Sequence, residues 1–318
     1  MTSSEKSRIR SLLVDSRGNL WVGTKNGLNV VKAGSNQLVS AFSDEHRPDS
    51  LNAQSVRVLL QGRDGKIWIG TRANGIAWIS PDQTTLSRTG HSKTKSAANP
   101  WYYAATESSN GDLWFGTIGD GVHIIDSSSA VLKRIVKRDE SRSGGLSLND
   151  IGSLFLDDSG LIWVGTWGSG INLFNSTNTA FKLFKTSLKQ TNHLSSPHVL
   201  SILESNNGNI WIGTQASDVD ILDIKQGVIE NYQMSSSPLK DNSIKALAQT
   251  NDESIWIGTR RAGLYRYNTM TKEFQLYDQG KGLGHHYIRS LLSASDGSLW
   301  IGTDSGLNRW LPETDSVV

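Results

Sequence analysis

One four-residue motif recurs seven times along the 318-residue chain: a tryptophan, then an aliphatic residue or phenylalanine, then glycine and threonine. The tryptophans are spaced 44 to 49 residues apart, at Trp21, Trp68, Trp114, Trp163, Trp211, Trp256 and Trp300. In six copies a glycine stands three residues before the tryptophan, and in the sixth copy Glu253 takes that place. A fixed period of about 40 to 50 residues is typical of β-propellers. The repeat therefore predicts an all-β, seven-bladed β-propeller.

The first copy indicates how one repeat folds. Apolar residues 9–14 predict a strand, a turn at Gly18 follows, and residues 20–24 predict the returning strand. Residues 28–31 and 37–42 predict a third strand and a more polar fourth strand. One copy is thus a four-stranded antiparallel blade. Because such a sheet cannot bury both faces alone, we expect neighbouring blades to stack around an axis.

The constant residues of the motif have a structural interpretation. A large aromatic residue at one place in every copy is best suited to filling the space between adjacent blades. The glycine after it indicates close approach of the backbone, and the threonine hydroxyl is expected to satisfy a nearby backbone group. We therefore exclude the seven tryptophans from the candidate site.

The ends of the chain set the expected domain boundaries. Residues 1–8 are a polar lead, and residues 9–318 are expected to form a single propeller. The seventh copy reaches only Val317 where its fourth strand should begin, so we expect an incomplete last blade and a natural protein that continues beyond residue 318. The N-terminus lacks the apolar core of a signal peptide, and no stretch approaches the 18 or so apolar residues of a spanning helix. This segment should not insert into a membrane.

Composition excludes several other classes. With 32 basic and 30 acidic residues, the charge is nearly balanced, which does not indicate a nucleic-acid partner. The chain has no cysteine, so disulfides and thiolate metal sites are absent. We expect no cofactor.

Basic residues gather at one expected rim of the ring. Antiparallel strands bring the start of each first strand, the end of the second and the following turn to the same edge. Eleven residues before each tryptophan stand Arg10, Arg57, Tyr103, Gly152, Leu200, Lys245 and Arg289, and the turns add Lys25, Arg72, Arg260 and Arg261. This pattern predicts a positive channel mouth that binds an anionic ligand. The alternative is a set of solvated surface charges.

Aromatic residues and histidines break the repeat at the same rim. They are Trp101, Tyr102 and Tyr103 in the third copy, Trp167 in the fourth, His198 in the fifth, and His285, His286 and Tyr287 in the seventh. Flat side chains beside hydrogen-bond donors suit a sugar-like ligand. The alternative is that Tyr102 fills the aliphatic core position and the others pack against a neighbouring blade or a second domain.

The fifth copy replaces a glycine-ended turn with residues 215–220, which include Asp218 and Asp220. Two carboxylates could coordinate a cation, but they are a weak metal signal. An aspartate also tolerates left-handed turn geometry, and we favour that explanation.

The repeat resembles a known family. Residues 296–307 read Asp-Gly-Ser-Leu-Trp-Ile-Gly-Thr-Asp-Ser-Gly-Leu, which is similar to the two-component regulator propeller repeat, and residues 49–52 and 146–150 resemble its linkers. The likeness covers the chain from about Ile9 to its end. It implies a non-catalytic, periplasmic ligand-sensing region of a histidine kinase, hybrid two-component system or diguanylate cyclase, often concerned with glycans. In such proteins a β-sandwich, a membrane helix and an output domain follow. A cytoplasmic location is expected instead if the chain is complete.

Two other functions remain open. Streptogramin lyase has a similar tryptophan-bearing repeat, and a metal-assisted lyase, including one acting on polysaccharides, would need a histidine base beside metal ligands. His198, His285 and His286 are placed for that role, but no acidic partner accompanies them in a known motif. We therefore expect no catalysis. A protein-interaction scaffold is the other alternative.

Overall fold

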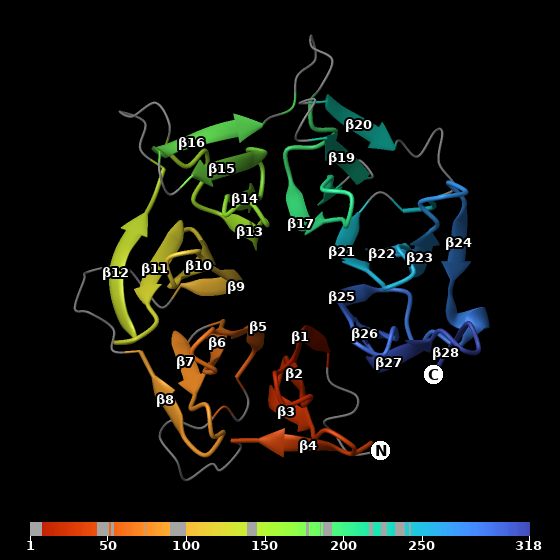
Figure 1. Cartoon of the computed structure of the whole chain (residues 1–318), viewed down its shortest axis with the longest axis horizontal. Helices are drawn as coiled ribbons and strands as arrows, with labels where there is room; N and C mark the ends of the chain where they lie inside the picture. Colours follow the sequence, from red (N-terminus) through yellow and green to blue (C-terminus); the bar gives the residue numbers. More distant parts are fainter. Residues whose placement is uncertain are drawn as a thin grey trace. The chain divides into compact units, whose positions relative to one another are not determined.

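Seven four-stranded antiparallel sheets make up the computed structural model (Figure 1). The structure describes residues 8–42, 51, 54–72, 74–89, 100–138, 145–175, 178–184, 186, 193–215, 219–223, 228–232, 239–241 and 243–318. The sheets are the blades of a seven-bladed β-propeller, which confirms the fold predicted from the repeat. We number the blades 1 to 7 in chain order.

The first four blades follow the expected strand order. Blade 1 contains β1 (Ile9–Val14), β2 (Leu20–Thr24), β3 (Gly27–Val31) and β4 (Leu38–Ala41). Blade 2 contains β5 (Val56–Gln61), β6 (Ile67–Thr71), β7 (Ile76–Ile79) and β8 (Leu86–Arg88). Blade 3 contains β9 (Trp101–Glu107), β10 (Asp112–Ile118), β11 (Val122–Asp126) and β12 (Val131–Val136). Blade 4 contains β13 (Ile151–Leu156), β14 (Ile162–Thr166), β15 (Ile171–Asn175) and β16 (Asn178–Phe184).

The last three blades repeat the same order. Blade 5 contains β17 (Val199–Glu204), β18 (Ile210–Thr214), β19 (Val219–Asp223) and β20 (Val228–Tyr232). Blade 6 contains β21 (Ile244–Gln249), β22 (Ile255–Thr259), β23 (Leu264–Tyr267) and β24 (Phe274–Tyr277), followed by the short 3₁₀ helix η1 (Gln279–Lys281). Blade 7 contains β25 (Ile288–Ser293), β26 (Leu299–Thr303), β27 (Gly306–Leu311) and β28 (Ser316–Val317). Among the described residues, no helix is long and apolar enough to span a bilayer.

The chain forms two compact units. The first comprises Met1–Val164 and Leu173–Lys182, and the second comprises Gly165–Asn172 and Leu183–Val318. Within the first unit the leading strands β1, β5, β9 and β13 pack one against the next, and within the second unit β17, β21 and β25 do so. Within each unit, each leading strand therefore lies beside the leading strand of the next blade.

Five of the repeated tryptophans lie between blades of the same unit, as predicted: Trp21, Trp68, Trp114, Trp211 and Trp256. Six of the seven are at most 4% exposed. Trp21 packs with Val56 and Ile67 of blade 2, and Trp256 packs with Ile288 and Trp310 of blade 7. Trp300 is the exception, since it is half-buried and has the guanidinium of Arg309 over its ring, 4.9 Å from the centroid.

The glycine after the tryptophan permits this stacking. A Cβ atom on Gly70 would stand 2.9 Å from the Cβ of Tyr102 in the next blade, and one on Gly258 would stand 2.6 Å from Ile288. Only glycine lets the next leading strand approach so closely. The threonine hydroxyl, in turn, donates to a backbone carbonyl of the following turn; Thr71 Oγ1 lies 2.8 Å from the oxygen of Gly75. Both structural predictions for the motif are confirmed.

The turn before each tryptophan uses a left-handed residue. Gly18 has φ +79° and Gly297 has φ +83°. Glu253, which replaces glycine in blade 6, adopts the same conformation with φ +64°. A residue other than glycine is strained at such a φ, so this turn destabilises blade 6 relative to a turn with glycine.

The last blade contains a fourth strand, which corrects the expectation that the seventh copy lacks one. The two-residue β28 pairs with β27, Val317 opposite Trp310 and Ser316 opposite Leu311. Backbone hydrogen bonds between Arg309 and Val318, 2.8 Å in each direction, extend the pairing. Because two residues have too weak an apolar pattern to predict a strand, the pairing could not be read from the sequence.

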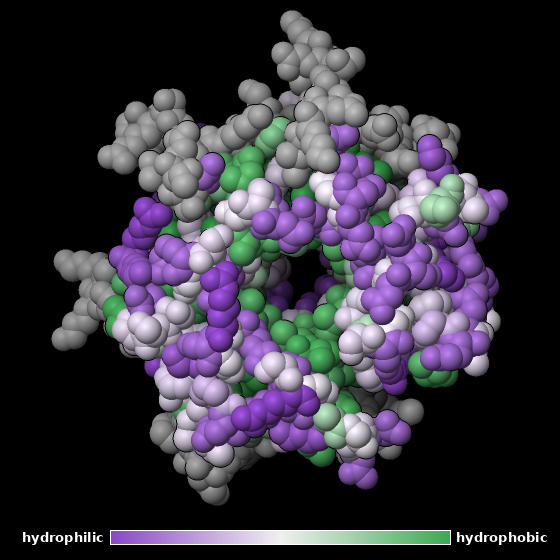
Figure 2. Space-filling view, in the orientation of Figure 1, coloured by the Kyte–Doolittle hydropathy of each residue, from purple (hydrophilic) through white to green (hydrophobic). Residues whose placement is uncertain are grey.

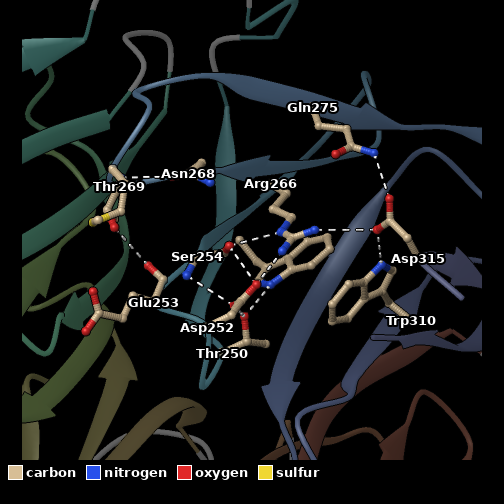
Figure 3. Close-up of polar contacts among 12 residues, drawn as sticks. Thr250, Asp252, Glu253, Ser254, Arg266, Asn268, Thr269, Gln275, Trp310 and Asp315 are labelled. Atoms are coloured by element: carbon tan, nitrogen blue, oxygen red, sulfur yellow. Dashed lines mark hydrogen bonds and ion pairs between the residues drawn. The ribbon is translucent and has the colours of Figure 1, made fainter. Parts of the chain in front are cut away.

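A carboxylate anchors this short strand to blade 6 (Figure 3). The carboxylate of Asp315 accepts from Trp310 Nε1 at 3.0 Å and from Gln275 Nε2 at 3.2 Å, and it lies 3.5 Å from Arg266 Nη1. Arg266 also contacts Asp252 of its own blade, and its guanidinium carbon lies 5.2 Å from the Trp310 ring centroid. The last blade is therefore tied to its neighbour by a polar network at the blade edge.

Candidate functional site

Three positions of the repeat come together at one edge of each blade, here called the loop rim. They stand thirteen and eleven residues before the tryptophan, at the start of the first strand, and four residues after it, in the turn that follows the threonine. Backbone hydrogen bonds join the first and third positions, for example Arg72 N to Ser55 O at 3.1 Å and Arg260 N to Ser243 O at 3.0 Å. The predicted shared edge is confirmed within the blades.

The position eleven residues before the tryptophan is the extra residue of a β-bulge. In blade 1, Ile9 pairs with Thr24 and Ser11 with Gly23, so that Arg10 is left over between them. The same irregularity isolates Arg57, Tyr103, Leu200, Lys245 and Arg289. A bulge disrupts the ladder locally and redirects a side chain, and bulges are over-represented beside functional sites. The spacing from the tryptophan identified this position in the sequence, but the bulge could not be predicted because it depends on how the first and second strands pair.

In the first unit, two arginines of blade 2 stack on two aromatic rings of blade 3. The guanidinium carbon of Arg57 lies 4.5 Å from the Tyr103 ring centroid, and that of Arg72 lies 3.8 Å from the Trp101 ring centroid. Trp101 is 39% exposed. These cation–π contacts hold the guanidinium groups against flat surfaces at the rim. The predicted residues Arg57 and Tyr103 form one pair, and Arg72 and Trp101 form the other. Arg10, which was also predicted, is half-buried at the bulge of β1.

In the second unit, Arg289 is held by an ion pair. Its guanidinium contacts both carboxylate oxygens of Asp304, and Nη2 lies 3.0 Å from Oδ2. Nη1 donates to the Tyr287 hydroxyl at 3.0 Å, while the guanidinium carbon lies 3.8 Å from the Tyr287 ring centroid. Arg260 of blade 6 approaches the same ring at 5.9 Å. The structure thus brings together Arg260, Tyr287 and Arg289 at the rim, and it adds Asp304, which the sequence analysis did not select.

Lys245 is the bulge residue of β21, beside the leading strand of blade 7. Burial, and then the charges of Arg260 and Arg289, lower its pKa to about 8, while Asp241 opposes the shift. Asp241 is itself buried and accepts from the backbone and guanidinium of Arg261. Lys245 is therefore a partly desolvated cation in a predominantly basic environment.

The predicted histidines and Trp167 have structural contacts. Trp167 pairs with His198 in an isolated antiparallel bridge, which joins the turn of blade 4 to the start of blade 5. The rings of His285 and His286 stack with centroids 4.3 Å apart, and His285 Nδ1 accepts from the backbone of Tyr287 at 3.0 Å. Across the described ranges, no three histidine or carboxylate side chains gather as metal ligands.

The carboxylate pair of the fifth copy does not form a described cation site. Asp218 lies outside the described residues. Asp220 is fully buried on β19, where its Oδ2 accepts from the backbone N–H of Ser195 at 2.9 Å. This bond favours a structural role for Asp220, since it holds the segment that enters blade 5.

The third blade contains a buried polar chain that the sequence analysis missed. The Tyr102 hydroxyl lies 3.1 Å from His123 Nδ1, and His123 Nε2 lies 2.9 Å from Asp120 Oδ2. Because a carboxylate only accepts, Nε2 carries a hydrogen, and in the neutral form of the ring Nδ1 is then the acceptor for the Tyr102 hydroxyl. Lys137 pairs with the other carboxylate oxygen. Burial and the Asp120 charge raise the pKa of Tyr102.

Tyr102 is buried at the core position that is aliphatic in the other copies. This agrees with the alternative that Tyr102 packs in the core and does not face a ligand. The two neighbours of Tyr102 in the sequence are Trp101 and Tyr103, the rings that the arginines of blade 2 cover. The buried chain therefore anchors the strand that presents both rings. The sequence contained one signal of this buried chain, a tyrosine at a position that is aliphatic in the other copies.

We expect Tyr102→Phe to lower the free energy of unfolding by about 1–3 kcal/mol, because it removes a buried hydroxyl that is hydrogen-bonded to His123. The measurement is urea unfolding followed by circular dichroism. Tyr103→Phe, which keeps the ring stacked on Arg57, is the control and should cost less. Equal losses in the two variants would show that the buried chain contributes no particular stability.

A shallow depression lies at the opposite rim, where the first and second strands are connected. It has a volume of about 110 Å³ and is lined by residues that include Ser108, Asn110, Trp114, Arg134 and Phe174. All of these belong to the first unit. None of them was selected from the sequence, so the depression is a separate surface from the loop rim.

Six segments of the chain match the family model described as two component regulator propeller. They are residues 3–26, 50–73, 145–168, 193–216, 238–261 and 282–305. The matches correspond to every copy except the third, which is the copy with Tyr102, Asp120 and His123.

Similar proteins include signalling proteins and one enzyme. Over 72 residues the chain is 39% identical to histidine kinase P4 of Formosa agariphila, a match that covers 21% of this chain and 5% of that protein. A solved extracellular domain, of a protein described as a hybrid two component system from B. thetaiotaomicron, superposes with a TM-score of 0.77 at 22% identity. That match covers 97% of this chain and 38% of the solved chain.

Virginiamycin B lyase from Staphylococcus aureus superposes with a TM-score of 0.70 at 14% identity, over 96% of this chain and 94% of the lyase. Both structural likenesses show the fold alone, and this chain spans only a small part of the histidine kinase and of the solved extracellular domain. Six segments, spread from residue 3 to residue 305, match one repeat model, so these repeats are similar to those described as two component regulator propeller.

Proposed function

We propose that this chain is a non-catalytic, ligand-sensing input region of a bacterial signal-transduction protein, and that it binds a sugar-like or anionic ligand at the loop rim. The observation that carries the proposal is the bulge. The core positions of the repeat stay nearly constant, while the bulge position changes from blade to blade and carries Arg57, Tyr103, Lys245 and Arg289. Variable side chains on a rigid scaffold are where specificity usually resides.

The contacts at the rim suit such a ligand. The guanidinium groups of Arg57 and Arg72 are oriented by the rings of Tyr103 and Trp101. Ligand binding therefore costs less side-chain conformational entropy at these two residues. Hydroxyl or carboxylate groups of a ligand can accept from these donors, and the exposed part of the Trp101 ring can pack against a sugar ring.

The wider role rests on the relatives. They include a histidine kinase and the extracellular domain of a protein described as a hybrid two component system. From this analogy and from the resemblance of the repeat, we propose that a sandwich module, a membrane helix and an output domain belong to the same polypeptide as this propeller, and that the propeller acts in the periplasm. Proteolysis of the natural protein followed by mass spectrometry would test whether these segments accompany it.

A thermal-shift screen tests ligand binding. Neutral and acidic oligosaccharides are added to the chain, because a ligand that binds only the folded state must raise its melting temperature. We expect Trp101→Ala and Arg57→Ala each to weaken binding of the best ligand about tenfold, which corresponds to roughly 1.4 kcal/mol. Arg134→Ala, an exposed arginine at the opposite rim, is the matched control.

Two results would contradict the proposal. One is unchanged affinity in both rim variants together with a loss in the Arg134 variant. The other is chemical conversion of the ligand during the titration, detected by mass spectrometry, which would support the lyase alternative instead.

A further inference from the structure

Positive charge exceeds negative charge at the rim of blades 6 and 7. The described side chains there include the cations Lys245, Arg260, Arg261 and Arg289, the carboxylates Asp241 and Asp304, and the stacked rings of His285 and His286. Arg289 pairs with Asp304, and Arg261 pairs with Asp241. Over the part of the chain that the structure describes, neither the Lys245 ammonium nor the Arg260 guanidinium has an ion pair.

We propose that Lys245 and Arg260 form a subsite for an anionic group, a carboxylate or a sulfate, carried by a sugar-like ligand. The proposal rests on the ligand-binding function proposed above and names the chemistry of one part of that site. It commits to the blades of the second unit, where β21 and β25 pack together and place Lys245 beside Arg289.

The surroundings of Lys245 explain why an anion is the fitting occupant. Its neighbours are Arg260 on the turn after β22 and Arg289 on β25, and together with burial they lower its pKa to about 8. The carboxylate that opposes this shift is Asp241, which already accepts two hydrogen bonds from Arg261. A bound anion would replace the lost hydration of the ammonium and reduce repulsion among the three cations.

Tyr287 supplies the polar contact beside this charge. The oxygen of the Tyr287 hydroxyl accepts from Arg289 Nη1. The hydroxyl hydrogen is not used in that bond and can be donated to an oxygen of the ligand. Asp304 holds Arg289 against the ring and keeps that arginine from swinging toward the anion. Lys245 and Arg260 are thus the charged contacts, and Tyr287 is a neutral one. In Figure 2 the surface over blades 6 and 7, at the right of the view, is predominantly hydrophilic.

Isothermal titration of the whole chain with D-glucuronate, D-glucose and inorganic sulfate tests the subsite. We expect glucuronate and sulfate to bind at pH 6.5 and glucose to bind at least about tenfold more weakly. Tighter binding of glucuronate than of sulfate would identify a carboxylate as the preferred group, and the reverse order would identify a sulfate. Lys245→Met should weaken glucuronate binding about tenfold, and Lys281→Met is the matched control.

The pH dependence separates this lysine from a general surface charge. Lys245 is protonated below its folded pKa of about 8 and loses its charge above it. Glucuronate affinity should therefore fall about tenfold between pH 6.5 and 9.5 in the wild type. Lys245→Arg should retain binding over that range, because a guanidinium stays protonated. Both variants should fold, since Lys245→Met removes a desolvated charge and Lys245→Arg preserves one.

Several outcomes would overturn the subsite. They are wild-type affinity in Lys245→Met, equal affinity for glucose and glucuronate, an unchanged affinity between pH 6.5 and 9.5, or no binding of either anion up to 20 mM or so. If Trp101→Ala and Arg57→Ala still weaken binding of an oligosaccharide, the proposed function stands and only the anion subsite is wrong. If no ligand of any charge binds the chain, the proposed function fails with it.

Discussion

Trp256→Ala is expected to lower the free energy of unfolding by about 3–5 kcal/mol. Trp256 is fully buried between blades 6 and 7, where its ring lies 4.7 Å from Trp310 and 5.3 Å from Tyr277, measured between centroids. Truncation leaves a cavity that stacked sheets cannot close, and it removes the aromatic contacts and the bond from Trp256 Nε1 to Thr250 Oγ1. Guanidinium unfolding monitored by circular dichroism measures the loss.

Trp101→Ala is the matched control, because it removes the same side chain from the rim instead of the core. Trp101 is 39% exposed and Arg72 covers its ring, so the loss of stability should stay within about 1 kcal/mol. The two variants separate the roles of the two tryptophans: Trp256 holds blades together, whereas Trp101 is proposed to contact ligand. Equal losses of stability would contradict that division.

Asp15→Ala is expected to cost about 3 kcal/mol, because several buried donors lose one acceptor. The carboxylate accepts from Trp21 Nε1 at 2.8 Å, from Asn19 Nδ2 at 3.0 Å and from Gln83 Nε2 of blade 2 at 2.6 Å. Burial raises the pKa of Asp15, but the hydrogen bonds from Trp21 and Asn19 and from the backbone outweigh it and hold the pKa below its usual value. Urea unfolding at pH 7 measures the loss.

The depressed pKa fixes the sign of the pH dependence. A carboxylate with a lowered folded pKa stabilises the protein above its unfolded pKa of 3.8, and this contribution is lost as the pH falls through the folded value. The stability difference between the wild type and Asp15→Ala should therefore be full at pH 7 and shrink below about pH 4. Asp15→Asn retains one acceptor oxygen and should cost less than Asp15→Ala at pH 7. A difference that grows on acidification would contradict the account.

Most of the fold could be predicted because the repeat encodes local rules seven times. Gly18 and its equivalents mark turns that need a positive φ, and Gly70 marks a place where the next blade leaves no room for a Cβ atom. Glu253 shows the limit of that reasoning. It adopts the glycine conformation without being glycine, because the paired strands on either side of the turn determine the geometry.

The candidate site could be predicted only as a set of positions. The spacing from the tryptophan selected Arg57, Lys245 and Arg289, but a bulge depends on the register of two strands, which no single position reveals. Contacts between residues far apart in the sequence were equally hidden. Asp304 pairs with Arg289, and Arg72 covers Trp101, so several of the predicted rim residues are engaged with one another.

The short last strand was missed for a related reason. Its stability comes from Asp315, whose carboxylate is bound by Trp310 and by Gln275 and Arg266 of blade 6. Such a side-chain network has no periodic signal in the sequence. The buried chain through His123 in blade 3 was hidden in the same way, although Tyr102 at an aliphatic position pointed to it.

The central claim is that ligand recognition belongs to the bulge residues of the loop rim and not to the constant motif. A crystal structure of the chain with the oligosaccharide that most raises its melting temperature tests this most directly. The account predicts ligand atoms within hydrogen-bonding or van der Waals contact of Arg57 and Tyr103, or of Lys245 and Arg260. Ligand bound instead at the opposite rim, in the depression lined by Ser108 and Arg134, would contradict it.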